Sequence, residues 1–200
     1  MSSKLSLSFY QDGDVVGISK SLLGKRLFSC FDGQLTGGII VETEAYRGPE
    51  DRASHAYGNR RTARTATMFQ AGGVAYVYLI YGIHQMFNVV TGPAELPHAV
   101  LIRGLEPIDG VEIMLQRRNR AKLDPKLTAG PGSLAKAMGF HKTQSGTALT
   151  GNKIWIEQAP NIPEAKIIAS PRVGIDYAEG WVDVPWRFRI KGSKWTSPAK

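Results

Sequence analysis

Two glutamates and a tyrosine at alternating positions of one apolar segment are the first residues in the sequence that could do chemistry. Glu42, Glu44 and Tyr46 lie within residues 37–46, GGIIVETEAY. Side chains alternate between the two faces of a β-strand, so these three would point the same way. Such a row is typical of a solvated strand face. Carboxylates at a strand end can also activate water as a general base or acid, and the residues alone leave both interpretations open.

Arg103 interrupts another apolar run, AVLIRGL, at residues 99–105. An unpaired guanidinium inside such a run is costly, so it must either reach solvent along its aliphatic stem or find an anionic partner. Reaching solvent is the commoner outcome. A carboxylate such as Glu44 would be a suitable partner.

An aromatic block formed by Tyr76, Tyr78 and Tyr81 continues with His84, Phe87 and Asn88. Aromatic residues in strands usually fill a core. Buried tyrosines need a hydrogen-bond partner, however, and three of them within six residues would also suit stacking on nucleobases.

Residues 51–70 carry four arginines (Arg52, Arg60, Arg61 and Arg64) among small and polar residues, with no apolar period. The composition predicts an exposed basic loop. An ordinary solvated surface segment explains it equally well. His55 in this segment is, by itself, an ordinary surface histidine.

The elements that must position these residues are short strands and two helices. β-Branched and aromatic residues predict strands at 37–46, 74–81, 98–105 and 186–191, separated by loops and helices rather than by tight hairpin turns. One helix is expected to begin at Pro107 and end in a basic tail, and a second to span residues 132–138 and stop at Gly139. The expected fold is mixed α/β (α+β): one domain over residues 1–200 with a curved, largely antiparallel, open-barrel-like sheet flanked by helices.

Composition narrows the class of protein. The chain has 25 Lys and Arg against 17 Asp and Glu, a net charge of +8, which favours an acidic partner such as a phosphate backbone. Its single cysteine, Cys30, excludes an internal disulfide and a cysteine-based zinc site. We expect an unprocessed, soluble and intracellular protein, because no leader or apolar stretch of ~18 residues is evident; its compartment would be the cytoplasm or nucleoid of a bacterium, or the nucleus of a eukaryote.

Five segments, in order and at compatible spacing, resemble the alkyladenine DNA glycosylase family, also called 3-methyladenine or methylpurine DNA glycosylases. They are VETEAYRGPEDRASHA, MFQAGGVAYVYLIYGIHQMFNVV, VLIRGLEP, AGPGSLAKAM and SPRVGIDYAEGW. The resemblance spans about residues 8–197, the expected core of the domain, and is specific because unusual polar residues recur inside apolar runs. It implies a base excision repair enzyme that flips a damaged purine out of duplex DNA and hydrolyses its bond to the sugar.

By that resemblance, Glu44 is the general base that activates water, Arg103 helps to hold the water, and the backbone carbonyl of Val173 is a third contact. The implied base pocket has Tyr46, His55 and Tyr78 as aromatic walls, with the backbone of Ala53 and His55 on the base edge. Two more residues complete it: Asn88, which would reject a guanine 2-amino group, and Leu101.

The resemblance also implies how DNA is held. Tyr81 is expected to wedge into the base stack, with Met68 flanking it. Phosphate contacts are expected from Arg60, Thr62, Arg64, Lys136 and Lys142, although Ser133 stands where the family often has a lysine.

The implied substrates are alkylated or deaminated purines in double-stranded DNA: 3-methyladenine, 7-methylguanine, hypoxanthine and ethenoadenine. Because no lysine or N-terminal amine stands in the nucleophile's place, we expect a monofunctional enzyme without lyase activity. It would act as a monomer, without metal, organic cofactor or membrane. Two alternatives are a silent module that binds bent or damaged DNA, and an enzyme acting on a free nucleoside or a folate-like carrier.

Overall fold

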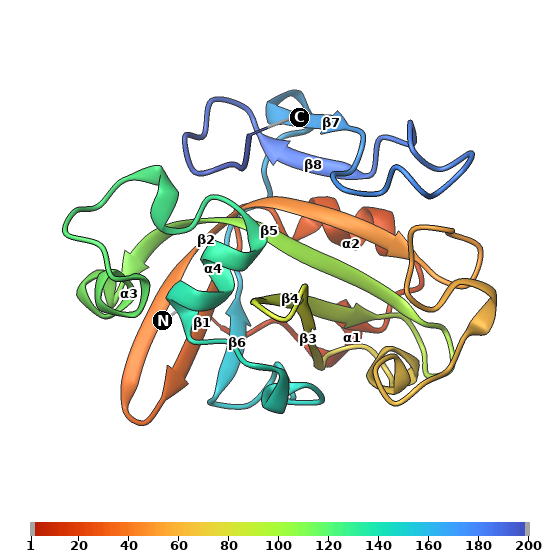
Figure 1. Cartoon of the computed structure of the whole chain (residues 1–200), viewed down its shortest axis with the longest axis horizontal. Coiled ribbons are helices and arrows are strands. Elements are labelled where there is room, and N and C mark those ends of the chain that lie inside the picture. Colours follow the sequence, from red (N-terminus) through yellow and green to blue (C-terminus); the bar gives the residue numbers. More distant parts are fainter. Residues whose placement is uncertain (1–2, 199–200) are drawn as a thin grey trace.

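An antiparallel sheet organises the computed structural model, which describes residues 3–198 (Figure 1). Six strands lie side by side in the order β3-β4-β5-β2-β1-β6, while β8 pairs with β2 and β7 pairs with β8. The eight strands in this part of the chain are β1 (Arg26–Phe31), β2 (Gln34–Arg47), β3 (Ala75–Ile80), β4 (His84–Thr91), β5 (His98–Asp109), β6 (Ile154–Glu157), β7 (Ile167–Ser170) and β8 (Arg187–Ile190). This confirms the expected mixed α/β fold with one curved antiparallel sheet.

The long strand β2 is the spine of the sheet. Its first half pairs with β1, Glu42 to Glu44 pair with β8, and β5 runs along the other edge for nearly its whole length. The β2–β5 register shifts between Ile40 and Glu42 and again between Glu42 and Thr43. A bulge of this kind bends a strand and strengthens its twist. The chain therefore bends where its two glutamates begin.

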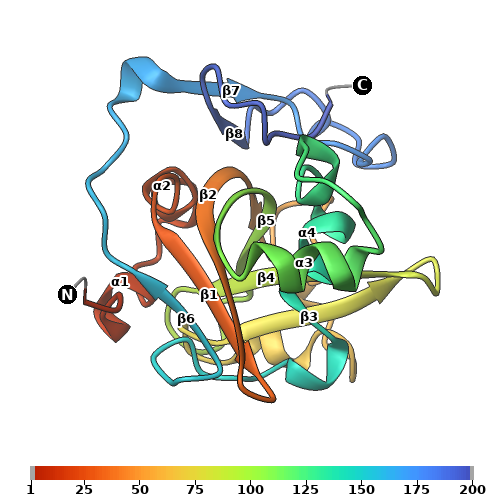
Figure 2. The same cartoon turned by 90° about the vertical axis from the view of Figure 1, so that its left-hand side faces the viewer.

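Helices cover both sides of the sheet. Figure 2 shows α2 (Val15–Ser21) on one side of β2 and β5, with α3 (Val111–Arg118) and α4 (Pro131–Met138) on the other. Asp14 begins α2 by accepting a hydrogen bond from the Gly17 N–H, while α4 starts on Pro131 and ends at Gly139 in the left-handed conformation. The short elements are α1 (Leu7–Tyr10) and 3₁₀ helices at Tyr57–Asn59, Ala66–Phe69, Pro125–Leu127, Lys142–Gln144 and Glu164–Lys166.

Successive side chains of β3 and β4 point to opposite faces of the sheet and enter two different buried clusters. Val77 and Phe87 face the main core, where the Phe87 ring stacks on Phe140 at 4.1 Å between centroids. Tyr76 and Val90 face the opposite side and pack with Met68 in a second cluster. The two strands therefore contribute residues to both hydrophobic clusters, one on each face.

The predicted elements are partly confirmed. The strands expected at 37–46, 74–81, 98–105 and 186–191 correspond to β2, β3, β5 and β8, and the helix expected at 132–138 is α4. The helix start predicted at Pro107 is wrong. Pro107 belongs to β5 and pairs with Gly38 of β2, and α3 begins at Val111. A register shift at Gly37 and Gly38 makes room for a residue that cannot donate a hydrogen bond.

The expectation that loops and helices, rather than tight turns, separate the predicted strands is wrong for residues 74–81 and 98–105, because a tight turn and β4 lie between them. Asp32 and Gly33, both with positive φ, join β1 to β2, and residues 81–83 join β3 to β4. Residues 51–70 are more than an exposed basic loop, because Ala56, Met68 and Phe69 from this segment are buried. No helix in the described part of the chain has the length and hydrophobicity to span a bilayer.

Candidate active site

Arg103 lies between the two glutamates of β2. Its Nε is 3.1 Å from Glu42 Oε1 and 3.4 Å from Glu44 Oε1, and its Nη1 is 3.5 Å from Glu44 Oε2. Both carboxylate side chains are fully buried and Arg103 is 6% exposed. The interpretation of Glu44 as a partner of Arg103 is confirmed, whereas a guanidinium that reaches solvent, and a solvated face for the glutamates, are wrong.

Two further donors hold the Glu44 carboxylate. The Tyr46 hydroxyl donates to Oε2 at 2.8 Å, and the backbone N–H of Val173 donates to Oε1 at 2.8 Å. The family resemblance implies that the Val173 carbonyl contacts the water. The hydrogen bond seen here uses the amide of the same residue, and it ties the loop before Gly174 to β2.

Burial fixes the charge states around this carboxylate. Burial raises the pKa of Tyr46 well above its ordinary value, and the Glu44 charge raises it further, so the phenol stays protonated and donates. Burial alone would lower the pKa of Arg103, but Glu44 and Glu42 outweigh it and the pKa is raised. Arg103 therefore stays a cation.

A cavity of about 320 Å³ opens beside the cluster, a size typical of a small-ligand site. Tyr46, Arg103 and Val173 separate Glu44 from it, so the carboxylate lies directly behind its wall. The lining includes ten residues expected from the sequence: Tyr46, Ala53, His55, Met68, Tyr78, Tyr81, Asn88, Leu101, Arg103 and Val173.

His55 and Tyr78 form one wall of the cavity, with ring centroids 4.6 Å apart and planes at 77°. Arg64 places its guanidinium 4.6 Å from the Tyr78 ring centre, and its Nη2 lies 3.2 Å from His55 Nε2. Arginine can only donate, so Nε2 accepts and Nδ1 carries the proton toward the Tyr76 hydroxyl, 3.1 Å away. The ring is fixed as one neutral tautomer.

Burial and the nearby Arg64 charge lower the pKa of His55 to about 4. The imidazole is therefore uncharged at neutral pH. Burial likewise raises the pKa of Tyr76 to about 12, so the hydroxyl that faces His55 is a neutral phenol. The wall presents aromatic faces without formal charge.

The remaining walls are set by backbone contacts. Asn88 is held by a hydrogen bond from its Nδ2 to the Tyr76 carbonyl at 3.1 Å, and it pairs with Leu101 across β4 and β5. Ala53 donates its N–H to Asp51 and accepts from the Tyr177 hydroxyl at 3.3 Å. The Ala53 N–H is therefore already used as a donor, whereas its carbonyl oxygen can still accept a second hydrogen bond.

Tyr81 occupies the turn between β3 and β4 with φ of 52° and a side chain that is 85% exposed. A non-glycine residue with positive φ costs about 1 kcal/mol, and such strain is characteristic of functional positions. Met68, expected to flank Tyr81, is instead 2% exposed and packed in the second cluster. Ile83, 74% exposed, is the apolar neighbour at the turn.

Ile83 and Tyr177 are among the residues of the site region that were not found from the sequence. Ile83 is an apolar residue two positions after Tyr81, and a turn assignment there would have revealed it. Tyr177 lines the mouth of the cavity and is 66% exposed. An aromatic residue four positions after Val173 carries no signal of its own.

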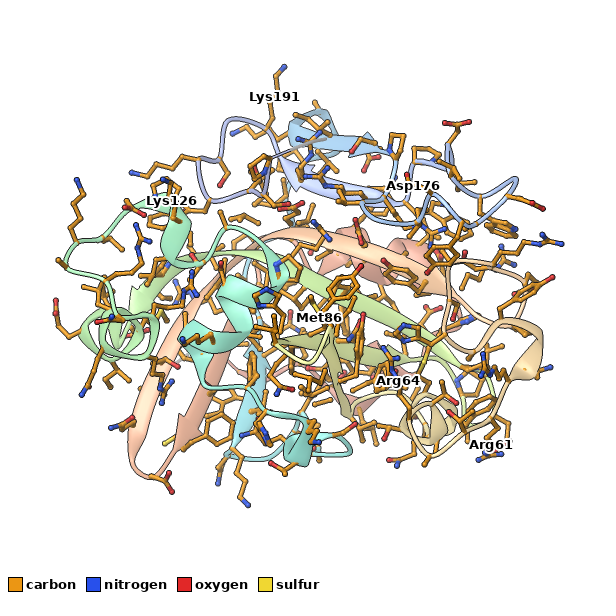
Figure 3. All side chains as sticks on the ribbon, viewed as in Figure 1. Arg61, Arg64, Met86, Lys126, Asp176 and Lys191 are labelled. Atoms are coloured by element: carbon orange, nitrogen blue, oxygen red, sulfur yellow. The ribbon has the colours of Figure 1, made fainter. Side chains whose placement is uncertain are left out.

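The five expected phosphate contacts are exposed and lie on both sides of the β3–β4 turn: Arg60, Thr62, Arg64, Lys136 and Lys142. Arg64 and Lys142 line one hollow beside β3, whereas Lys136 and Arg118 line another beside β4. Figure 3 shows Arg61 and Arg64 at the end of the molecule formed by residues 51–70. Arg61 there is bound to Glu95 at 2.7 Å. The described residues contain no group of three or more His, Cys, Asp or Glu placed to hold a metal ion.

Comparisons with known proteins place this geometry in context. The family model described as Methylpurine-DNA glycosylase (MPG) matches residues 8–194. A Bacillus cereus protein named "Putative 3-methyladenine DNA glycosylase" is 48% identical over 199 residues, covering 95% of this chain and 97% of the relative. A protein of the same name from Bacillus anthracis is 47% identical with the same coverage.

The His55 geometry predicts an unusual titration. We expect His55 to stay neutral until the pH falls to about 4, because burial and Arg64 oppose its protonation. NMR titration of the four histidines, with His55→Gln to assign the signal, measures it. Arg64→Ala should move the midpoint upward. A His55 midpoint near 6.5, the usual value, would contradict the proposed tautomer and its environment.

Proposed function

The chain belongs to the methylpurine-DNA glycosylase family, and from this premise we propose that it removes alkylated and deaminated purines from duplex DNA by hydrolysis alone. The proposed substrates are 3-methyladenine, 7-methylguanine, hypoxanthine and ethenoadenine, each flipped out of the helix before the bond to its sugar breaks. The product is an abasic site. One observation carries the proposal: a buried carboxylate, held by Arg103 and Tyr46, directly behind an aromatic pocket.

In the proposed reaction the bond between the sugar C1′ and the base nitrogen breaks, and its electron pair leaves with the base. The sugar becomes cationic, and the Glu44 carboxylate stabilises it. Water attacks C1′ and gives a proton to Glu44. We assign the orientation of that water to Arg103, whose Nη1 lies 3.5 Å from Glu44 Oε2.

The chemistry of the pocket walls supports a preference for damaged purines. The faces of Tyr46 and Tyr78 attract electron-poor or cationic rings. A protonated imidazole would repel a cationic methylpurine, and His55 is held neutral. Asn88, fixed by the Tyr76 carbonyl, is proposed to exclude the 2-amino group of normal guanine.

The exposed turn supports base flipping. Tyr81 is proposed to fill the gap left by the extruded nucleotide, with Ile83 rather than Met68 as its apolar neighbour. Unstacking one base costs a few kcal/mol, which such contacts must offset. The exposed cations on either side of the turn would hold the two flanking backbones.

Base release from a defined duplex tests the proposal. The purified protein is incubated with a duplex carrying one hypoxanthine, and strand breaks are compared with and without hot alkali. We expect breaks only after alkali, and Glu44→Gln should lower the rate by at least about 100-fold while DNA binding is kept. Breaks before alkali would reveal lyase activity. Binding without release would favour a silent DNA-binding module, and release from free inosine alone would favour a nucleoside enzyme.

A second prediction concerns the wedge. Tyr81→Ser should lower the rate on a hypoxanthine paired in duplex DNA by about 10-fold or more, because the vacated stack is no longer filled. Release from a hypoxanthine in a single-stranded oligonucleotide should change much less. The comparison uses single-turnover rates on both substrates, with Leu123→Ser, another exposed apolar position, as the control. Equal losses on the two substrates would contradict a wedge.

A third prediction separates free from bound arginines in residues 51–70. Among the described residues Arg60 is exposed and forms no ion pair, whereas Arg61 is bound to Glu95. Arg60→Ala should flatten the dependence of log affinity on log salt by about 0.9, one phosphate contact, and Arg61→Ala should do less. Fluorescence anisotropy at several salt concentrations measures both slopes. An unchanged slope in Arg60→Ala would remove that residue from the interface.

A further inference from the structure

Glu42, the second glutamate of β2, has no part in the reaction proposed above, yet its carboxylate accepts four hydrogen bonds. Its Oε1 accepts from Arg103 Nε at 3.1 Å, Arg187 Nε at 2.7 Å and Ser197 Oγ at 2.8 Å. Its Oε2 accepts from the Ser197 backbone N–H at 2.5 Å. The side chain is fully buried. Four donors from three distant parts of the chain converge on one carboxylate.

Ser197 closes the cluster from the C-terminal segment. Its hydroxyl lies 3.1 Å from Arg103 Nη2 and 3.2 Å from Arg187 Nη2, and its carbonyl accepts from Arg187 Nη2 at 2.9 Å. The Arg103 guanidinium is thus held at Nη2 by Ser197, and at Nε more closely by Glu42, at 3.1 Å, than by Glu44, at 3.4 Å. Only Nη1 is directed toward Glu44 alone.

The cluster contains two carboxylates and two guanidinium groups. Arg187 lies opposite Glu44 in the β2–β8 register and is 2% exposed, so its charge is not screened by solvent. Without Glu42, the Glu44 carboxylate would face two uncompensated cations. A carboxylate in that field binds a proton more weakly and is a poorer general base.

We propose that Glu42 is a positioning residue for base excision: it directs Arg103 toward Glu44 and offsets the charge of Arg187, which keeps Glu44 basic enough to take a proton from water. The inference rests on the proposed function of Glu44. Glu42 touches neither the cavity nor the reacting atoms, and it acts through its neighbours.

The sign of its effect depends on everything that faces Glu44. Tyr46 and Tyr78 are phenols whose pKa values are raised by burial, so they stay neutral. Arg172, stacked on Tyr46, is neutralised by the buried Asp51. The charges that decide the balance are those of Arg103, Arg187 and Glu42.

The test uses a duplex with one 7-methylguanine, whose cationic base leaves without protonation, so the acid limb of the rate profile reports the general base alone. Single-turnover rates are measured from pH 4.5 to 8.5 against a no-enzyme blank. Glu42→Gln should lower the plateau by about 10- to 100-fold and move the acid limb to lower pH by about 1. Arg187→Gln should move the limb to higher pH. The double variant, with the balance restored, should return it close to the wild-type position.

Two variants control for general damage. Glu42→Asp keeps the charge but withdraws the carboxylate, so it should lower the plateau and leave the limb in place. Glu164→Gln, the same change at a side chain that is 73% exposed, should alter neither. Circular dichroism and DNA affinity establish that each variant is folded. If Glu42→Gln does not fold, Arg187→Gln alone still gives the sign of the shift.

The outcomes separate the two ideas. A wild-type protein that releases no 7-methylguanine refutes the proposed function. An active wild type with acid limbs that stay in place, or that move in the same direction for Glu42→Gln and Arg187→Gln, refutes the role of Glu42 and leaves the proposed function standing.

Discussion

The buried pairing of Arg103 with two carboxylates of β2 is the constraint on which the rest of the site depends. Removing a charge from water costs several kcal/mol, so each group here must be met by an opposite charge and by hydrogen bonds. Meeting both needs brings together β2, β5, β8 and the C-terminal Ser197. The bulge at Glu42 lets the strand leave β1 and receive β8 at this place. The strand pairings at Glu42–Glu44 are therefore also what brings the arginines to the carboxylates.

A second buried ion pair couples this cluster to the base pocket. Arg172 binds Asp51 and donates to the carbonyl of Ala45, the residue between Glu44 and Tyr46, at 2.9 Å. Asp51 fixes the amide of Ala53 in the pocket wall, while the residue after Arg172 is Val173, whose amide holds Glu44. Displacing this pair would move the pocket wall and the carboxylate together. One buried ion pair therefore supports both the cavity wall at Ala53 and the Glu44 carboxylate.

The sequence predicted β5 because its apolar run is continuous, and it predicted α4 because Gly139 is a strong signal for the end of a helix. It missed β1, β6 and β7, which are short and mix polar with apolar residues, and it missed β4 because the turn at Tyr81 lacks the usual Asn-Gly or Asp-Gly signature. Glu44 and Arg103 stood out as polar residues in apolar runs. Ser197 did not, because a serine near the end of a chain is ordinary until its contact with Glu42, 155 positions away, is known.

The distances around Arg103 show that its guanidinium binds the two carboxylates of β2 unequally. Arg103 is bound firmly by Glu42, at 3.1 Å, and loosely by Glu44, at 3.4 and 3.5 Å. Contacts of that length are weak, so Glu44 keeps lone-pair capacity toward Arg103 even though Tyr46 and Val173 fix its orientation. Because Arg103 is anchored on Glu42, its guanidinium binds the Glu44 carboxylate only weakly.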